Sequence, residues 1–277
     1  MPSWIDILIF YIVYFLPSIT LTLLALITGI LVYFLGKRKN LIIMNNTFKK
    51  TKQCSKDWIT NFKLAEESTT GRTYLLEVKP NLSLKDFRVH FTMVNRHLIL
   101  SKIASILRKR RDYILLEADP SDNVVKRYQL EVLPRREEKM IKALLDMLGE
   151  LEPLELGSSK LEEMFIFRVN DSELFLTAFK KGKHIIRNLY SLRNQIIRLS
   201  YYPLESPSIR IVAVLSESLN LKPLMDLLFT LTANIADLGK KGYYSKQRTV
   251  GLRIHEDKTV EKDKRKYKGR GRNLDLS

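Results

Sequence analysis

The residue types that usually carry catalysis are few and scattered in this sequence. Cys54 is the single cysteine, and neither His90 nor His97 has a second histidine or a carboxylate at a metal-ligand spacing. No glycine-rich phosphate loop and no hydrolase motif of the G-x-S-x-G or H-E-x-x-H kind is present. Adjacent acids such as Glu137 and Glu138 point to different sides of a helix and make poor acid–base pairs. We therefore expect a protein that is not an enzyme and needs no metal or cofactor.

Cations are the chemically active residues that this sequence gathers. It has 47 Lys and Arg against 30 Asp and Glu, a formal net charge of +17. Residues 36–56 contain seven basic residues and no acid, and residues 240–277 contain 13 basic and 5 acidic residues. The segment between them is nearly balanced. This distribution indicates a folded body with two contacts to anionic partners.

The segment from Lys258 to Arg272 has eight cations, two acids and almost no apolar residue, so it cannot fold alone. Glycine-spaced arginines beside a tyrosine are typical of flexible RNA-binding segments. A solvated tail and a contact with anionic membrane lipid are the alternatives. The candidate ribosome or RNA contacts are Lys240, Lys241, Lys246, Arg248, Lys262, Lys264, Arg265, Lys266, Lys268, Arg270 and Arg272.

Two shorter basic clusters are secondary candidates for an anion contact. The first follows a predicted helix, where cations also complement the helix dipole. The second lies in a predicted strand-to-helix turn, where backbone amides add to an anion site, although a solvated loop is the alternative. These clusters are Arg108, Lys109, Arg110 and Arg111, and Lys180, Lys181 and Lys183.

Residues Ile7 to Gly36 carry no charge, and this run is long enough to cross a bilayer. We expect the span at about Phe15–Leu35. Asp6 precedes the run and Lys37-Arg38-Lys39 follows it, the reverse of a signal peptide. The positive-inside rule then predicts an outer N-terminus and a cytosolic body. The chain should be a single-pass protein of a prokaryotic cell membrane, or of the endoplasmic reticulum in a eukaryote.

Hydrophobic periodicity predicts an α+β fold after the membrane helix, with a mainly antiparallel sheet, helices packed on it, and a final long amphipathic helix and basic tail. The expected divisions are an anchor over 1–36, a basic juxtamembrane connector over 37–72, the α+β domain over 73–241 and a flexible tail over 242–277. The predicted strands are Tyr74–Val78, Phe87–Val94, Tyr113–Ala118, Arg127–Leu133, Met164–Val169, Glu173–Phe179 and Ile209–Leu215. The third and fourth strands, and the fifth and sixth, are expected to form hairpins. The predicted helices are Arg96–Arg110, Arg135–Leu148, Lys183–Leu199 and Pro223–Lys240.

The middle of the chain resembles the calumin family, coiled-coil-domain proteins of the multipass translocon of the endoplasmic reticulum. The resemblance rests on Arg96–Leu151, RHLILSKIASILRKRRDYILLEADPSDNVVKRYQLEVLPRREEKMIKALLDMLGEL. In that family a Leu-rich helix leads to a strand, an acidic turn, a second strand and an amphipathic helix. Pro207–Lys240, with its strand, Leu219–Met225 and long helix, extends the likeness, as does the single membrane span.

This resemblance implies a function in membrane-protein insertion. Calumin pairs with a small membrane partner, Asterix, in an intramembrane chaperone complex (the PAT complex) beside the Sec translocon and the ribosome. The resemblance therefore implies contacts with the ribosome, the translocon and an Asterix-like partner. The chain lacks a signal peptide, a long acidic region and an extended coiled coil, which indicates a minimal, archaeal-type member. The competing hypotheses are a membrane scaffold whose basic segments bind only anionic lipid, and an enzyme with an unrecognised site.

Overall fold

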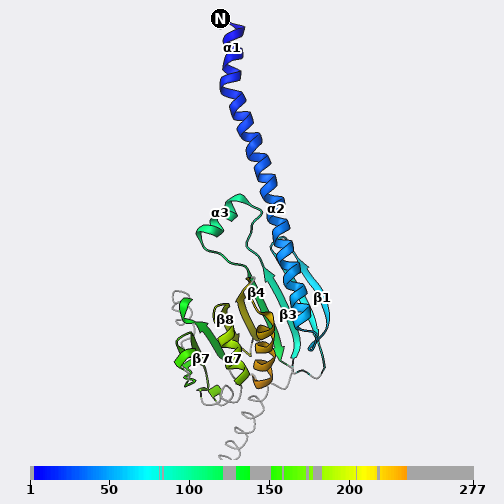
Figure 1. Cartoon of the computed structure of the whole chain (residues 1–277), viewed down its shortest axis with the longest axis vertical. Coiled ribbons are helices and arrows are strands. Elements are labelled where there is room, and N and C mark those ends of the chain that lie inside the picture. Colours follow the sequence, from blue (N-terminus) through cyan, green and yellow to red (C-terminus); the bar gives the residue numbers. More distant parts are fainter. Residues whose placement is uncertain are drawn as a thin grey trace, which may run out of the picture.

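The computed structural model describes residues 3–80, 82, 84–120, 129–137, 151–157, 159–172, 175–176, 183–203, 205–216 and 219–235. It begins with one helical rod that continues into an α+β domain (Figure 1). The rod consists of α1 (Trp4–Phe10), a π-helical segment (Tyr11–Phe15) and α2 (Leu16–Cys54). It is long and apolar enough to cross a membrane, and its most apolar window is almost entirely exposed. The predicted N-terminal apolar helix is thus confirmed.

Nine strands in the described residues form one sheet, in the order β1-β2-β3-β4-β9-β8-β5-β7-β6. Every neighbouring pair is antiparallel, which confirms the predicted α+β class with a mainly antiparallel sheet. The strands are β1 (Ile59–Glu67), β2 (Gly71–Val78), β3 (Leu84–Thr92), β4 (Tyr113–Pro120), β5 (Leu130–Pro134), β6 (Glu152–Pro153), β7 (Phe165–Val169), β8 (Ile196–Tyr201) and β9 (Ile209–Val214).

Short helices connect the strands. They are α3 (Ile99–Leu107), a 3₁₀ turn (Arg135–Glu137), α5 (Ser159–Glu162) and α7 (Lys183–Ser191). A further helix covers residues 221–235. The remainder of the predicted C-terminal helix, the basic tail and most of the predicted helix Arg135–Leu148 lie outside the described residues.

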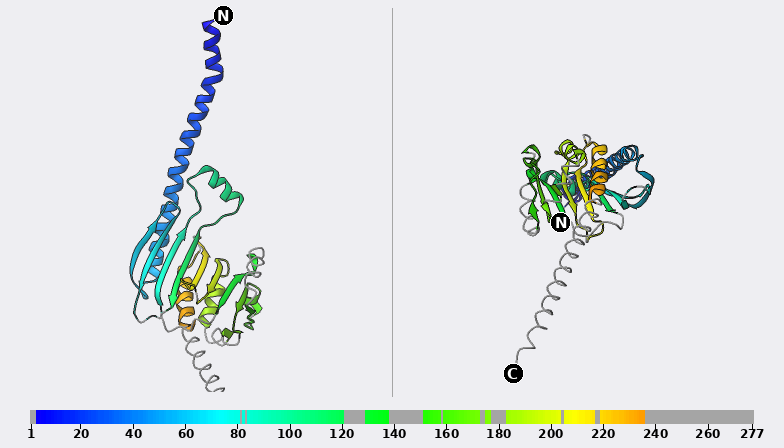
Figure 2. Two further views of the ribbon diagram at one scale, coloured as in Figure 1. Left: turned by 180° about the vertical axis from the view of Figure 1, so that it is seen from behind. Right: turned by 90° about the horizontal axis from the view of Figure 1, so that it is seen from below.

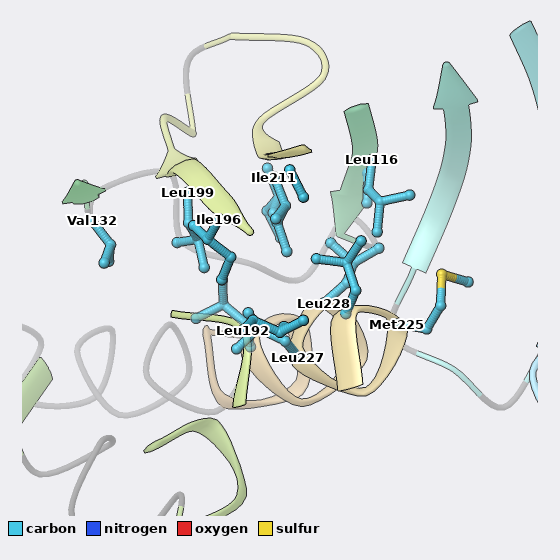
Figure 3. Packing of buried hydrophobic residues seen from close by; sticks show 14 of the residues in the cluster. Leu116, Val132, Leu192, Ile196, Leu199, Ile211, Met225, Leu227 and Leu228 are labelled. Atoms are coloured by element: carbon cyan, nitrogen blue, oxygen red, sulfur yellow. The ribbon is translucent and has the colours of Figure 1, made fainter. Parts of the chain in front are cut away.

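One face of the sheet is covered by the domain half of α2, α7 and helix 221–235, as the end-on view shows (Figure 2). Strand residues alternate between this face and the opposite one, as the burial of Phe87, Val89 and Phe91 illustrates. Helix 221–235 contributes Leu224, Leu227, Leu228, Leu231 and Ile235, spaced by three or four residues and all buried. Figure 3 shows Leu227 and Leu228 beneath Leu116 and Ile211 of the sheet.

The domain half of α2 is part of this core. Met44 is fully buried, and the Phe48 ring stacks on Tyr74 with a centroid distance of 4.2 Å. Trp58, just after α2, lies 4.7 Å from the Phe229 ring of helix 221–235. The C-terminal half of α2 is therefore packed in the domain, and no separate linker lies between the apolar segment and the domain.

The expected connector over 37–72 is structured. Residues 37–54 continue α2, and β1 forms the edge of the sheet, paired to β2. Sequence patterning missed β1 because only Ile59 in that strand is buried, so its composition is that of a solvated segment. The structure also begins α3 at Ile99 and ends it at Leu107, inside the predicted Arg96–Arg110.

Both predicted hairpins are wrong. β4 pairs with β3 and β9, and β5 pairs with β7 and β8, so the strands of the first hairpin are not neighbours. In the second, Phe175 and Leu176 are helical where a strand was predicted. Alternation of apolar residues identifies a strand, but it does not specify the partner of that strand.

The predicted helix Lys183–Leu199 is also too long. Helix α7 ends at Ser191, and Ile196–Tyr201 forms β8 between β5 and β9. The β-branched pair Ile196-Ile197 and the aromatic Tyr201 favour a strand, and the central place of β8 in the sheet decides between the two structures.

Candidate membrane interface

Helix α3 exposes an unusually apolar surface. Leu100 is 82% exposed, Leu107 77% and Ile106 67%, and Ile103 is half exposed. At 100° per residue these side chains fall on one stripe with Ile99, opposite Ser101 and Ser105. Ser105 is the buried residue of α3, so the helix turns its polar side inward and its apolar side out.

Helix α3 lies beside α2 at the end of the domain from which the apolar rod emerges (Figure 1). Two extended segments connect it to the domain, one from the end of β3 and one to the start of β4 (Figure 2). An open groove of about 610 Å³ separates the two helices. Val32 and Leu35 of α2 line one side of it, and Ile106 lines the other. The apolar stripe of α3 is thus level with the last uncharged turn of α2.

Gly36 permits the close contact that fixes this arrangement. A Cβ atom at Gly36 would lie 2.3 Å from the Arg96 carbonyl oxygen and 2.7 Å from the His97 backbone nitrogen. One turn earlier, the Tyr33 ring meets the edge of the His97 ring at 5.6 Å. The backbone that leads into α3 therefore packs directly on α2 where its charge-free run ends.

A polar network then joins α2 to the turn between β1 and β2 and to the segment between β3 and α3. Asn40 is fully buried on α2, and its Nδ2 donates to the Thr69 and Val94 carbonyls, each at 3.1 Å. Its Oδ1 accepts from Arg96 Nη1 at 2.8 Å. The Arg96 guanidinium also binds both Asp112 oxygens, at 2.9 and 2.6 Å.

Asp112 closes this junction network on the far side of α3. Its side chain is 7% exposed, and its Oδ1 also accepts from the Val94 backbone N–H at 2.7 Å. Arg96 precedes α3 and Asp112 follows it, so the ion pair clasps both ends of the segment that carries the helix. A bidentate, largely desolvated pair of this kind specifies geometry more than it adds stability.

Cations surround this end of the molecule. Arg38 and Lys39 are exposed on α2 just past the uncharged run, and with Lys49 and Lys50 they line a second groove of about 910 Å³. Lys102, Lys109, Arg110 and Arg111 line the groove between α2 and α3. Basic residues and exposed apolar residues therefore occupy the same end of the domain.

Of the two secondary clusters predicted from sequence, the structure describes Arg108–Arg111 and the backbone of Lys183. Arg108–Arg111 follow α3, and Lys109 ends that helix with a left-handed backbone, φ 48°. Lys183 begins α7 towards the other end of the domain (Figure 1). Lys180, Lys181 and the eleven candidate contacts of the tail lie outside the described residues.

A buried carboxylate is present elsewhere, on β5. Glu131 is fully buried, and it accepts hydrogen bonds from Arg198 Nε at 2.7 Å and from the Tyr202 hydroxyl at 2.9 Å. Burial raises the pKa of Glu131, while its hydrogen bonds to Arg198 and Tyr202 oppose that rise. This cluster joins β5 to β8 and its following turn. Among the described residues, no group of three or more His, Cys, Asp or Glu side chains could hold a metal ion.

Sequence reasoning missed the junction and the exposure of α3. A lone asparagine four residues after a glycine carries no motif, and the stripe of α3 looks the same whether it faces a core or a membrane. Asn40 comes four residues after Gly36, behind three exposed-type cations, and only the fold reveals that it is buried with partners.

No protein-family model matches this chain, and no curated protein is significantly similar to it.

Proposed function

We propose that this chain is a membrane-anchored, non-enzymatic factor that contacts the ribosome and assists translocon-dependent insertion of multipass membrane proteins. The observation that carries the proposal is the cationic end of the domain, held to the apolar helix through Gly36 and Asn40. A body fixed in this way holds its cations at one height beside the bilayer, where a membrane-bound ribosome presents rRNA phosphates. The resemblance of Arg96–Leu151 to calumin supports the same function.

The proposed topology follows from the charges that flank the apolar helix. Lys37, Arg38 and Lys39 at its domain end favour the cytosolic side, so the N-terminus lies outside. This orientation puts the domain on the side where ribosomes dock. The proposed partners are the ribosome, the Sec translocon and a small Asterix-like membrane protein.

Ribosome cosedimentation after detergent extraction tests this function. We expect the full chain to pellet with ribosomes and to be released as salt rises, because cation–phosphate contacts depend on counterion release. A double variant with Arg110→Glu and Arg111→Glu should bind less. Its matched control is Arg187→Glu with Lys222→Glu, which makes the same charge change on α7 and helix 221–235. Equal binding of the two double variants would contradict a ribosome contact at the end of α3.

A membrane scaffold without ribosome contact is the second candidate. The observation that favours it is the placement of Arg110 and Arg111 beside the uncharged turn of α2, where anionic headgroups also lie. It predicts no cosedimentation after detergent extraction. Binding to vesicles of anionic lipid would then be the only salt-sensitive interaction of the chain.

A further inference from the structure

We infer that α3 lies in the surface of the bilayer that α2 crosses, with its apolar stripe inserted among the lipid chains of the domain-side leaflet. The inference needs a spanning α2 but neither of the two proposed functions. It concerns the apolar surface of α3, which ribosome binding does not explain, because exposed leucine and isoleucine do not bind rRNA phosphates.

The composition of α3 matches an interfacial helix. Such helices have a strong apolar face and a polar face with cations. Here the nine residues of α3 carry the exposed stripe of Leu100, Ile103, Ile106 and Leu107, with Lys102 beside it. A soluble helix with this pattern would bury the stripe in the core, but the structure instead directs Ser105 inward.

The depth of α3 relative to α2 gives the second argument. Ile106 shares a groove with Val32 and Leu35, which belong to the charge-free run of the spanning helix. When those residues sit at the edge of the hydrocarbon, Ile106 sits there too. Lys39, Lys102, Lys109 and Arg110 line the same groove, where long cationic side chains reach the headgroups while their stems stay in apolar surroundings.

The attachment of α3 gives the third argument. Its entry is packed against Gly36, and both ends of its segment are clasped by the Arg96–Asp112 pair bound to Asn40. The depth of the stripe is therefore set by the fold. Lipid is the occupant that fits, because a stripe held at this depth beside a spanning α2 meets the bilayer without needing any further protein. The bilayer would then hold the domain at two points and fix the direction in which the sheet faces.

Spin-label accessibility on the full chain tests this inference. Cys54→Ser supplies a background without cysteine, and single cysteines at Leu100 and Leu107 are labelled after reconstitution into vesicles of phosphatidylcholine and phosphatidylglycerol. We expect high accessibility to oxygen and loss of accessibility to a nickel chelate at both sites. Leu64, an exposed leucine on β1 that is 46% exposed, is the matched water-facing control. Leu24 in α2 is the matched hydrocarbon control.

The two controls separate the possible failures. If Leu24 is shielded from nickel while Leu100 and Leu107 behave like Leu64, then α3 is in water, and the inference is wrong. A protein partner would then be the better occupant of the stripe. If Leu24 is also accessible to nickel, α2 does not span, and the inference fails together with the anchor. Shielding of Leu100 and Leu107 but not Leu64 would support it.

Discussion

At the scale of single residues, the junction between α2 and the domain depends on the small size of Gly36 and on the hydrogen bonds of Asn40. Gly36 contributes by lacking a side chain, because the Arg96 backbone occupies the space of its Cβ. Asn40 contributes by satisfying the Thr69 and Val94 carbonyls inside the fold. Together they fix the position of α3 relative to α2.

Gly36→Ala should therefore disturb the junction. The new methyl group would meet backbone atoms at 2.3 to 2.7 Å, and backbone cannot rotate away as a side chain can. Overpacking of this kind costs about 1–3 kcal/mol of unfolding free energy. Gly29→Ala is the matched control in the same helix, since nothing lies within 4 Å of its Cβ position. Chemical unfolding in detergent micelles measures both, and equal stability of the two variants would refute the close contact.

The Arg96–Asp112 pair supports a second prediction. Asp112→Asn removes the charge from a side chain that is 7% exposed and leaves Arg96 without its anion. Breaking a buried pair in this way costs about 3 kcal/mol or more. Glu205→Gln, in the Arg210–Glu205 pair, makes the same chemical change on a side chain that is 49% exposed and should cost less than about 1 kcal/mol. Thermal unfolding in detergent compares them, and a smaller effect at Asp112 would contradict its role.

At the scale of elements, the sequence predicted the parts of the fold that depend on periodicity. The apolar helix, α3, β7 and β9 appear close to their predicted positions because each has a clear local pattern. Strand pairing was not predictable, since β5 and its partner β8 are separated by more than 60 residues and only tertiary packing selects them. The exposure of α3 was also hidden, because an amphipathic stripe does not identify what covers it.

Helix 221–235 should be the element most sensitive to charge. Leu231 is 2% exposed in the layer between this helix and the sheet, so Leu231→Asp would bury an unpaired carboxylate. We expect a loss of more than about 3 kcal/mol in unfolding free energy. Ala233→Asp introduces the same residue two positions later, on an exposed side, and should cost less than about 1 kcal/mol. Comparable losses in urea unfolding would show that this face of the helix is not the buried one.

At the scale of the whole molecule, charge and apolar surface are distributed along one axis. The uncharged part of the rod leaves the domain at the end that also carries α3 (Figure 1), and cations line the groove between α3 and α2. Residues 240–277 add a second basic segment with 13 cations and 5 acids. In the proposed function, both basic groups are candidates for the ribosome contact, and the two can be tested separately.

Deleting residues 258–277 should separate these two groups. The deletion removes the cations from Lys258 to Arg272, so ribosome cosedimentation should weaken and its dependence on salt should flatten. Membrane attachment and the melting of the domain should stay unchanged, because both depend on α2 and the sheet. The matched control keeps the full length and replaces the same cations with glutamine, which separates charge from chain length. If both variants bind ribosomes with the slope of the intact chain, the tail is not the RNA contact. The cations from Arg108 to Arg111 would then be the remaining candidates for that contact.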